Sequence, residues 1–289
     1  MRVITLTDPN RIREFLLTDR FFADYARGDL DPEHFRFTQW FGTEEDETLC
    51  ALVMLYNDLN PPIFFAMGEA CGIELILDRA IQHSQLSLSI REEHLPLVER
   101  FYQAKPVPML KMALVREDFW AAGQAIENRT LRAGADRRPA PTKESPAFEI
   151  EIASRFALAM TRLDIAHMPL LEELYSHGGG DAFRQRSLEL GVFYGVFDNK
   201  RLVSVAGTHI VSDQERIAAL GNVMTHPDYR GQGLATIATD AVCKELLDRG
   251  IELIGLSVSR SNEAAIRVYE KIGFKRHVPF YEGTAIRIL

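Results

Sequence analysis

A short segment rich in glycine offers the clearest chemistry in this sequence. Arg230, Gly231 and Gly233 follow an apolar run, residues 217–224, and precede an amphipathic run that begins at Leu234. A strand that leads through a glycine-rich turn into the start of a helix is an arrangement that proteins use to bind phosphate groups. Small residues let the backbone approach an anion, and the first N–H groups of the helix point at it. We therefore expect a site for a nucleotide-like ligand at this turn.

The neighbours of the turn decide between this site and an ordinary loop, in which glycines serve only a left-handed turn. The guanidinium of Arg230 can reach phosphate oxygens, and Pro227 stiffens the approach to the turn. A dinucleotide site would require a third glycine and an acidic residue about twenty positions further on. Leu234 and Ala235 follow the turn instead. The sequence therefore predicts a phosphate-bearing ligand that is not a dinucleotide.

A second group of residues lies on a helix predicted over 262–272. Asn262, Ala265, Ile266 and Tyr269 have the spacing i, i+3, i+4 and i+7, which places them on one helix face. If that face lines the same site, Asn262 can hydrogen-bond an amide-bearing ligand and Tyr269 can give a proton to a leaving group. The alternative is an asparagine at a helix start and a half-buried tyrosine.

Together these motifs resemble a known family. The patterns Val223-x-x-x-Pro227-x-x-Arg230-Gly-x-Gly-x-Ala235 and Asn262-x-x-Ala265-x-x-x-Tyr269-x-x-x-Gly273-Phe274 resemble the GNAT superfamily of acyl-CoA-dependent N-acyltransferases. The layout of the chain is similar to glycine N-acyltransferase-like proteins, with two GNAT-like copies of which the first is degenerate.

The resemblance implies a role for each matching residue. It implies a bulged strand whose backbone at Val223 and Thr225 binds the acyl carbonyl and the pantetheine arm, and it makes Tyr269 the general acid for the departing CoA thiolate. It implies neither a protein nucleophile nor a metal. The residues expected to contact acetyl-CoA are Val223, Met224, Thr225, Arg230, Gly231, Gln232, Gly233, Leu234, Ala235, Thr236 and Asn262.

The general base stays unassigned. Residues 218–222 contain no carboxylate, although the family often has a glutamate on this strand. Glu215 at the strand's start and His209 on the neighbouring strand are candidates that act through water, but both are also typical of a surface or strand-edge position. Asn222 is a candidate for orienting such a water.

The fold class is expected to be α/β, with two tandem GNAT-like domains, each a mixed and mostly antiparallel sheet flanked by helices. Prolines and charges without apolar periodicity predict a linker at 132–147, between a degenerate domain at 1–131 and an acetyltransferase domain at 148–289. Leu88-Ser-Ile-Arg91 is echoed by Leu256-Ser-Val-Ser-Arg260, which suggests an internal duplication. The first copy has Glu69 and no basic residue at its turn, so we expect it not to bind the same ligand.

Periodicity predicts the elements of both halves. In the first half we expect strands at 35–41, 49–56, 63–67 and 86–90 and a helix at 73–80. In the second half we expect strands at 155–161, 190–197, 201–211, 217–224 and 251–258, helices at 165–177, 234–249 and 262–272, and two short strands at the end. One helix face should be buried, formed by Leu234, Ile237, Ala238, Ala241 and Val242.

Composition narrows the classes of function. The chain has 289 residues, 46% hydrophobic and 26% charged, and a formal net charge of -8, which argues against nucleic-acid binding. Cys50, Cys71 and Cys243 are scattered and are expected to be reduced core thiols. Neither a signal peptide nor a membrane-spanning run is evident, so we expect a cytoplasmic monomer or homodimer without a membrane partner.

The resemblance implies an enzyme, an N-acetyltransferase that moves an acetyl group from acetyl-CoA to a primary amine of a small molecule. The amine attacks the thioester directly while both substrates are bound. The alternative is a non-catalytic acyl-CoA-binding sensor, which the missing strand carboxylate favours and Tyr269 disfavours.

Overall fold

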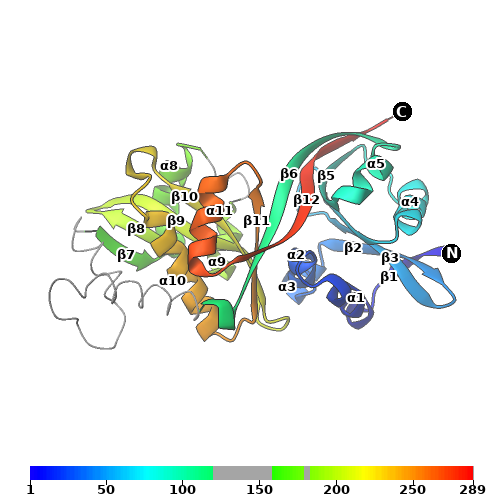
Figure 1. Ribbon diagram of the computed structural model, residues 1–289, viewed down its shortest axis with the longest axis horizontal. Coiled ribbons are helices and arrows are strands. Elements are labelled where there is room, and N and C mark those ends of the chain that lie inside the picture. The colour runs from blue at the N-terminus through cyan, green and yellow to red at the C-terminus, as the bar shows by residue number, and fades with distance from the viewer. Residues whose placement is uncertain (120–157, 179–182, 289) are drawn as a thin grey trace, which may run out of the picture. The chain divides into compact units, whose positions relative to one another are not determined.

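The computed structural model describes residues 1–119, 158–178 and 183–288. They form a mixed α/β fold with a mostly antiparallel sheet flanked by helices (Figure 1). The chain divides into two compact units. The first contains Met1–Met112, Ser257–Glu263 and Arg276–Leu289, and the second contains Ala113–Leu256 and Ala264–Lys275.

The first unit has the strand order β1-β2-β3-β4-β5-β12-β6. β4 and β5 are parallel, whereas the pairs β1/β2, β2/β3, β3/β4 and β5/β12 are antiparallel. Its strands are β1 (Arg2–Leu6), β2 (Thr38–Glu45), β3 (Thr48–Tyr56), β4 (Ile63–Gly68), β5 (Gln85–Arg91), β6 (Tyr102–Val115) and β12 (Lys275–Arg287). Its helices are α1 (Pro9–Leu16), η1 (Leu17–Asp19), α2 (Asp24–Gly28), α3 (Pro32–Phe35), α4 (Ala70–Arg79), η2 (Glu92–His94) and α5 (Leu95–Val98).

The second unit has the strand order β11-β10-β9-β8-β7. β10 and β11 are parallel, and the other neighbours are antiparallel. Its strands are β7 (Leu158–Arg162), β8 (Tyr194–Asp198), β9 (Arg201–Ser212), β10 (Ile217–Thr225) and β11 (Leu253–Ser259). Its helices are η3 (Ile165–His167), α8 (Met168–Tyr175), α9 (Gln185–Leu190), η4 (Pro227–Tyr229), α10 (Leu234–Asp248) and α11 (Glu263–Ile272).

The two units repeat one pattern. In each, three antiparallel pairs are followed by a helix and a parallel strand: β1 to β5 with α4 in the first, and β7 to β11 with α10 in the second. This shared order is what an internal duplication would produce.

The predicted buried face of α10 is confirmed. Leu234, Ile237, Ala238, Ala241 and Val242 are all buried. Burial of a leucine or isoleucine side chain contributes roughly 1.5–3 kcal/mol, so this face holds the start of α10 firmly against the sheet.

The end of the chain differs from the prediction of two short strands. β12 is one strand of 13 residues. It pairs with β5 of the first unit from Phe280↔Arg91 to Ile286↔Gln85. Gly283 permits the continuous strand, because its φ is +141° and a side chain there would overlap the carbonyl of Lys105.

Three smaller expectations also need correction or stay open. Leu190 ends the helix α9 and does not begin a strand. Cys243 is a core thiol as expected, but Cys50 is half-buried and Cys71 is exposed. The linker expected at 132–147 and the boundaries at 131 and 148 lie outside the described residues, so the domain division remains a prediction.

Candidate functional site

A bulge interrupts β10 near its end. The pairing of β10 with β9 shifts between Gly221 and Met224, and Asn222 has a φ of +54°. A bulge of this kind turns backbone groups away from the neighbouring strand, and bulges are common beside active sites. The residues for which the resemblance implied acyl contacts, Val223 and Thr225, thus lie at and just after an irregular stretch of backbone.

On the edge of β10 that faces β11, the pairing of the two strands ends before this bulge. β10 pairs in parallel with β11 from Ile217↔Leu253 to Leu220↔Leu256. β10 itself continues to Thr225. Within the described residues, the last part of β10 therefore carries backbone groups that β11 does not take up.

The turn that follows presents an open helix start. Gly231 and Gly233 have φ values of +76° and +80°, which favour glycine. Gly233 is the N-cap of α10, and no side chain among the described residues caps this end. A side chain at Gly231 would meet no atom within 4 Å in the part of the chain that the structure describes, so the space beside the turn is open there. Uncapped N–H groups, the helix dipole and free space are the features that an anion site needs.

His226, just after β10, and Arg201 at the start of β9 hold the approach to this turn. His226 is buried and accepts a hydrogen bond from the amide of Asp228 at 3.3 Å, which caps η4. Its Nε2 lies 2.8 Å from the guanidinium of Arg201. Burial, and then the charge of Arg201, lowers the pKa of His226, so this imidazole is neutral at pH 7.

Arg230 is exposed at the edge of the open space. Its Nε donates to the carbonyl of Thr225 at 3.2 Å. That bond uses Nε and fixes the stem of the side chain, and a guanidinium has four further N–H groups that can donate to an anion.

Tyr269 lies inside the second unit, on α11. Its side chain is buried at 8% exposure, with its ring 5.8 Å from that of Phe274. Burial, and then the thiol of Cys243, raises the pKa of Tyr269 to about 12. The hydroxyl is therefore protonated at neutral pH, as a proton donor must be.

The structure brings most of the expected residues into one unit. Val223 to Thr225, Arg230 to Thr236 and Tyr269 belong to the second unit, whereas Asn262 is exposed and belongs to the segment Ser257–Glu263 that groups with the first. The roles of all these residues remain predictions.

The two base candidates are separated by the fold. A surface or strand-edge position was predicted for Glu215; its 7% exposure rules out the surface, and it lies two residues before β10. It precedes β10 at the end opposite the bulge, roughly 20 Å along the strand from Asn222. The pairing of β9 with β10 has a second register shift, between Ala219 and Leu220, and His209 lies opposite it on β9. A side chain at Gly221 would overlap the imidazole of His209. His209 is thus the candidate beside the bulge.

Sequence reasoning missed the residues that hold the bulge. Tyr175 on α8 donates from its hydroxyl to the carbonyl of Asn222 at 2.8 Å. Ser204 on β9 donates to the carbonyl of Met224 at 3.2 Å. No local motif marks either residue, because each acts through a contact distant in sequence.

The corresponding turn of the first unit is closed. β4 ends at Gly68, and α4 begins at Ala70, so one residue separates strand and helix. A side chain at Gly68 would overlap the carbonyl of Cys50. The Gly68 carbonyl accepts a hydrogen bond from Nε2 of His94 at 3.1 Å. The register of β4 against β3 carries no shift like that of β10.

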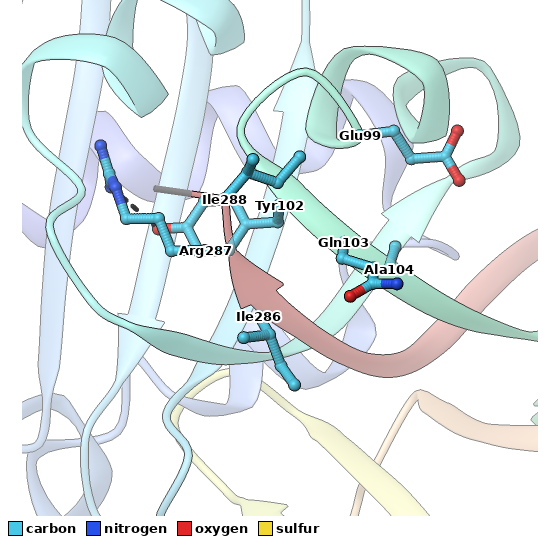
Figure 2. Close-up of a pocket in the computed structure, with 7 residues that line it drawn as sticks. All are labelled: Glu99, Tyr102, Gln103, Ala104, Ile286, Arg287 and Ile288. Carbon is cyan, nitrogen blue, oxygen red and sulfur yellow. Dashed lines mark hydrogen bonds between the residues drawn. The ribbon is translucent and has the colours of Figure 1, made fainter.

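A shallow pocket also lies on the first unit (Figure 2). It is lined by Glu99, Tyr102, Gln103, Ala104, Ile286, Arg287 and Ile288. Arg287 donates to the carbonyl of Ile81 at 2.5 Å and contacts the Tyr102 hydroxyl at 3.2 Å. With its cation so engaged and Glu99 beside it, this pocket is poorly suited to a pyrophosphate.

Two further searches concern other classes of site. Among the described residues no group of three or more His, Cys, Asp or Glu side chains is placed to hold a metal. No described helix is long and apolar enough to cross a membrane.

Comparison with known proteins supports the class that this geometry suggests. Residues 160–274 match the model of the Acetyltransferase (GNAT) family. The [Ribosomal protein bS18]-alanine N-acetyltransferase of Escherichia coli (strain K12) is 38% identical over 76 residues, which are 26% of this chain and 49% of that protein. The mycothiol acetyltransferase of Kytococcus sedentarius is 35% identical over 80 residues, 27% of each chain. The chain thus spans about half the length of the first of these curated relatives and about a quarter of the second.

Two solved structures are similar in fold to almost the whole chain. A Drosophila protein of structural-genomics origin gives a TM-score of 0.66 at 12% identity, over 99% of this chain and 98% of that one. A tandem GNAT protein from the clavulanic acid biosynthesis pathway gives 0.53 at 12% identity, over 99% and 98%. At these identities the likeness shows the fold alone. Together with the family match, it supports a GNAT-type acetyltransferase region in the second half of the chain.

Proposed function

We propose that this protein is an N-acetyltransferase that moves the acetyl group of acetyl-CoA to a primary amine of a small molecule. The observation that carries this proposal is the combination in β10 and α10. Among the described residues, a bulged strand end that pairs with β9 but no longer with β11 leads into an open, uncapped helix start. A strand that can bind an extended amide chain, followed by an anion site, suits a pantetheine arm with its pyrophosphate.

Each part of the site then has a task. The amides of the turn from Gly231 to Thr236 bind the pyrophosphate, with Arg230 beside them. The backbone at Val223 and Thr225 binds the pantetheine and the acyl carbonyl, and Asn262 is a further contact to the pantetheine.

The reaction needs no covalent intermediate on the protein. A neutral amine attacks the thioester carbonyl, and backbone N–H groups of the bulge stabilise the oxyanion, an effect of about 3 kcal/mol per donor in other acyl transfers. When the C–S bond breaks, the Tyr269 hydroxyl gives its proton to the CoA thiolate. The sequence leaves the general base unassigned. We assign this role to His209, acting through water, because its imidazole lies beside Gly221.

We assign the single acyl-CoA site to the second unit. The first unit is a degenerate GNAT-like copy in this proposal, and the tandem layout is similar to glycine N-acyltransferase-like proteins. Its short turn, with Glu69 as the N-cap of α4, leaves neither space nor charge for a phosphate.

The amine that accepts the acetyl group is the part of the proposal that has the fewest observations behind it. Curated relatives are named for acetylation of a ribosomal protein alanine and for mycothiol, so their names span protein and small-molecule chemistry. A small-molecule amine remains our choice, with the protein as a cytoplasmic monomer or homodimer.

A thiol-release assay tests the proposal against the rival, a non-catalytic acyl-CoA sensor. The protein is mixed with acetyl-CoA and a panel of amino acids, amino sugars, polyamines and a peptide with an N-terminal alanine. We expect amine-dependent release of CoA thiol. Tight acetyl-CoA binding without release from any amine would favour the sensor and contradict the enzyme.

A further inference from the structure

The bulge of β10 is held by a tyrosine from a helix. Tyr175 is the last residue of α8, a helix that packs against β9 and β10. Its hydroxyl donates to the carbonyl of Asn222, the residue with positive φ, at 2.8 Å. This bond spans 47 positions of sequence and reaches the backbone at the irregular point of the strand.

The bulge needs such support because its conformation is costly. Asparagine adopts a φ near +54° more readily than other residues that carry a side chain, but this conformation still costs more than extended backbone and needs its surroundings to hold it. The Asn222 side chain donates from Nδ2 to the Thr208 carbonyl at 3.3 Å, and Ser204 donates to the Met224 carbonyl at 3.2 Å. These two bonds come from β9, so Tyr175 supplies the anchor from the helix side.

The tyrosine ring is itself firmly placed. It packs on the apolar cluster that contains Leu171, Leu174 and Met224, and its ring lies 5.1 Å from that of Phe183. Burial raises the pKa of Tyr175, so its hydroxyl remains a hydrogen-bond donor. A rigid ring with a protonated hydroxyl can fix the Asn222 carbonyl within narrow limits.

We propose that Tyr175 is a positioning residue that sets the bulge of β10 for the acyl carbonyl of the ligand. This inference rests on the proposed function, because it assumes that the backbone just after Asn222 binds the thioester. Tyr175 contacts neither substrate in this account. It acts by fixing the direction of the peptide group between Asn222 and Val223, whose N–H is the nearest to the anchored carbonyl.

The test compares Tyr175→Phe with a matched control, Tyr102→Phe. Both changes remove one tyrosine hydroxyl bonded to a backbone carbonyl, since Tyr102 donates to His83 at 2.9 Å in the first unit. Calorimetric titration measures the affinity for acetyl-CoA and for free CoA, which lacks the acyl carbonyl. We expect Tyr175→Phe to weaken the binding of acetyl-CoA about tenfold, as expected for one misplaced hydrogen bond, and to weaken the binding of free CoA clearly less. Tyr102→Phe should leave both affinities unchanged.

Activity and stability provide independent readouts. The kcat of Tyr175→Phe should fall about tenfold. Both variants should lose a few degrees of melting temperature, and Tyr102→Phe should lose more because its hydroxyl also accepts a hydrogen bond from Arg287. Ser204→Ala, which removes the anchor at Met224, should also reduce the preference for acetyl-CoA over CoA. An equal loss of affinity for both ligands would make Tyr175 a purely structural residue and overturn the inference. The inference also fails if neither variant differs from the wild type, or if the wild type binds acetyl-CoA no more tightly than CoA.

Failure of the proposed function has a different signature. If the wild type releases no thiol with any amine, acetyl transfer is refuted. A Tyr175→Phe protein that still loses its preference for acetyl-CoA would then support the positioning role in a binding protein.

Discussion

Substitution of Gly231 by alanine tests the phosphate site with a small perturbation. Gly231 has a φ of +76°, and a side chain there would meet no atom of the described residues within 4 Å. The added methyl group therefore creates no clash in the free protein. It occupies open space on the turn that leads into α10, where we place the pyrophosphate.

The magnitude follows from two separate terms. The left-handed backbone costs alanine about 1 kcal/mol relative to glycine, which corresponds to a fall of about 2–4 °C in the melting temperature of a unit of this size. Displacement of the phosphate weakens one charge-assisted hydrogen bond, a contribution of about 1.5–3 kcal/mol. We therefore expect the dissociation constant for CoA to rise about tenfold to a hundredfold.

The control is Gly250→Ala, just beyond the other end of the same helix. Gly250 also has a positive φ, +92°, and open space around a side chain, but it lies at the C-terminal end, where an anion is repelled. Titration calorimetry with CoA at fixed salt and thermal melts should show equal destabilisation for the two variants and lost affinity only for Gly231→Ala. Equal CoA affinities for both variants would refute the placement of the pyrophosphate.

Further predictions concern the neighbouring side chains. Arg230→Ala should weaken CoA about tenfold and reduce the salt dependence of binding, as measured by titration at several ionic strengths; an unchanged salt dependence would remove Arg230 from the site. Tyr269→Phe should lower kcat about a hundredfold or more with CoA affinity unchanged, and a wild-type rate would end its role as general acid. Because the pKa of Tyr269 is raised to about 12, its hydroxyl keeps its proton as pH rises through 10, so the wild-type kcat should show no loss near the ordinary tyrosine pKa. Gly221→Ala should cost about 1–3 kcal/mol in urea melts by overlap with His209, and His209→Ala in the same chain should recover most of it; purely additive losses would contradict the contact.

The elements around the turn could be predicted from sequence because their signals are local. Apolar periodicity located β10, α10 and β11 to within a few residues, and the five residues of the α10 face are all buried as predicted. The glycines at 231 and 233 have the positive φ values that make such a turn. These features depend on residues that are close together in the chain, so a short stretch of sequence is enough to predict them.

The rest depends on contacts between distant segments. A strand at the end of the chain pairs with β5, and no local pattern distinguishes that partner from a strand of its own half. The hydroxyl of Tyr175 and the imidazole of His209 reach the bulge only through the packing of α8 and a slip in β9. The sequence could therefore indicate a donor site but not the residues that hold its backbone in shape.

A crystal structure of the full chain with bound CoA tests the central claim most directly. The account predicts one CoA per chain, with its pyrophosphate on the amides from Gly231 to Thr236, Arg230 beside it and the pantetheine along the end of β10. CoA density at the turn between Gly68 and Ala70, or anywhere else than on the start of α10, would contradict the account.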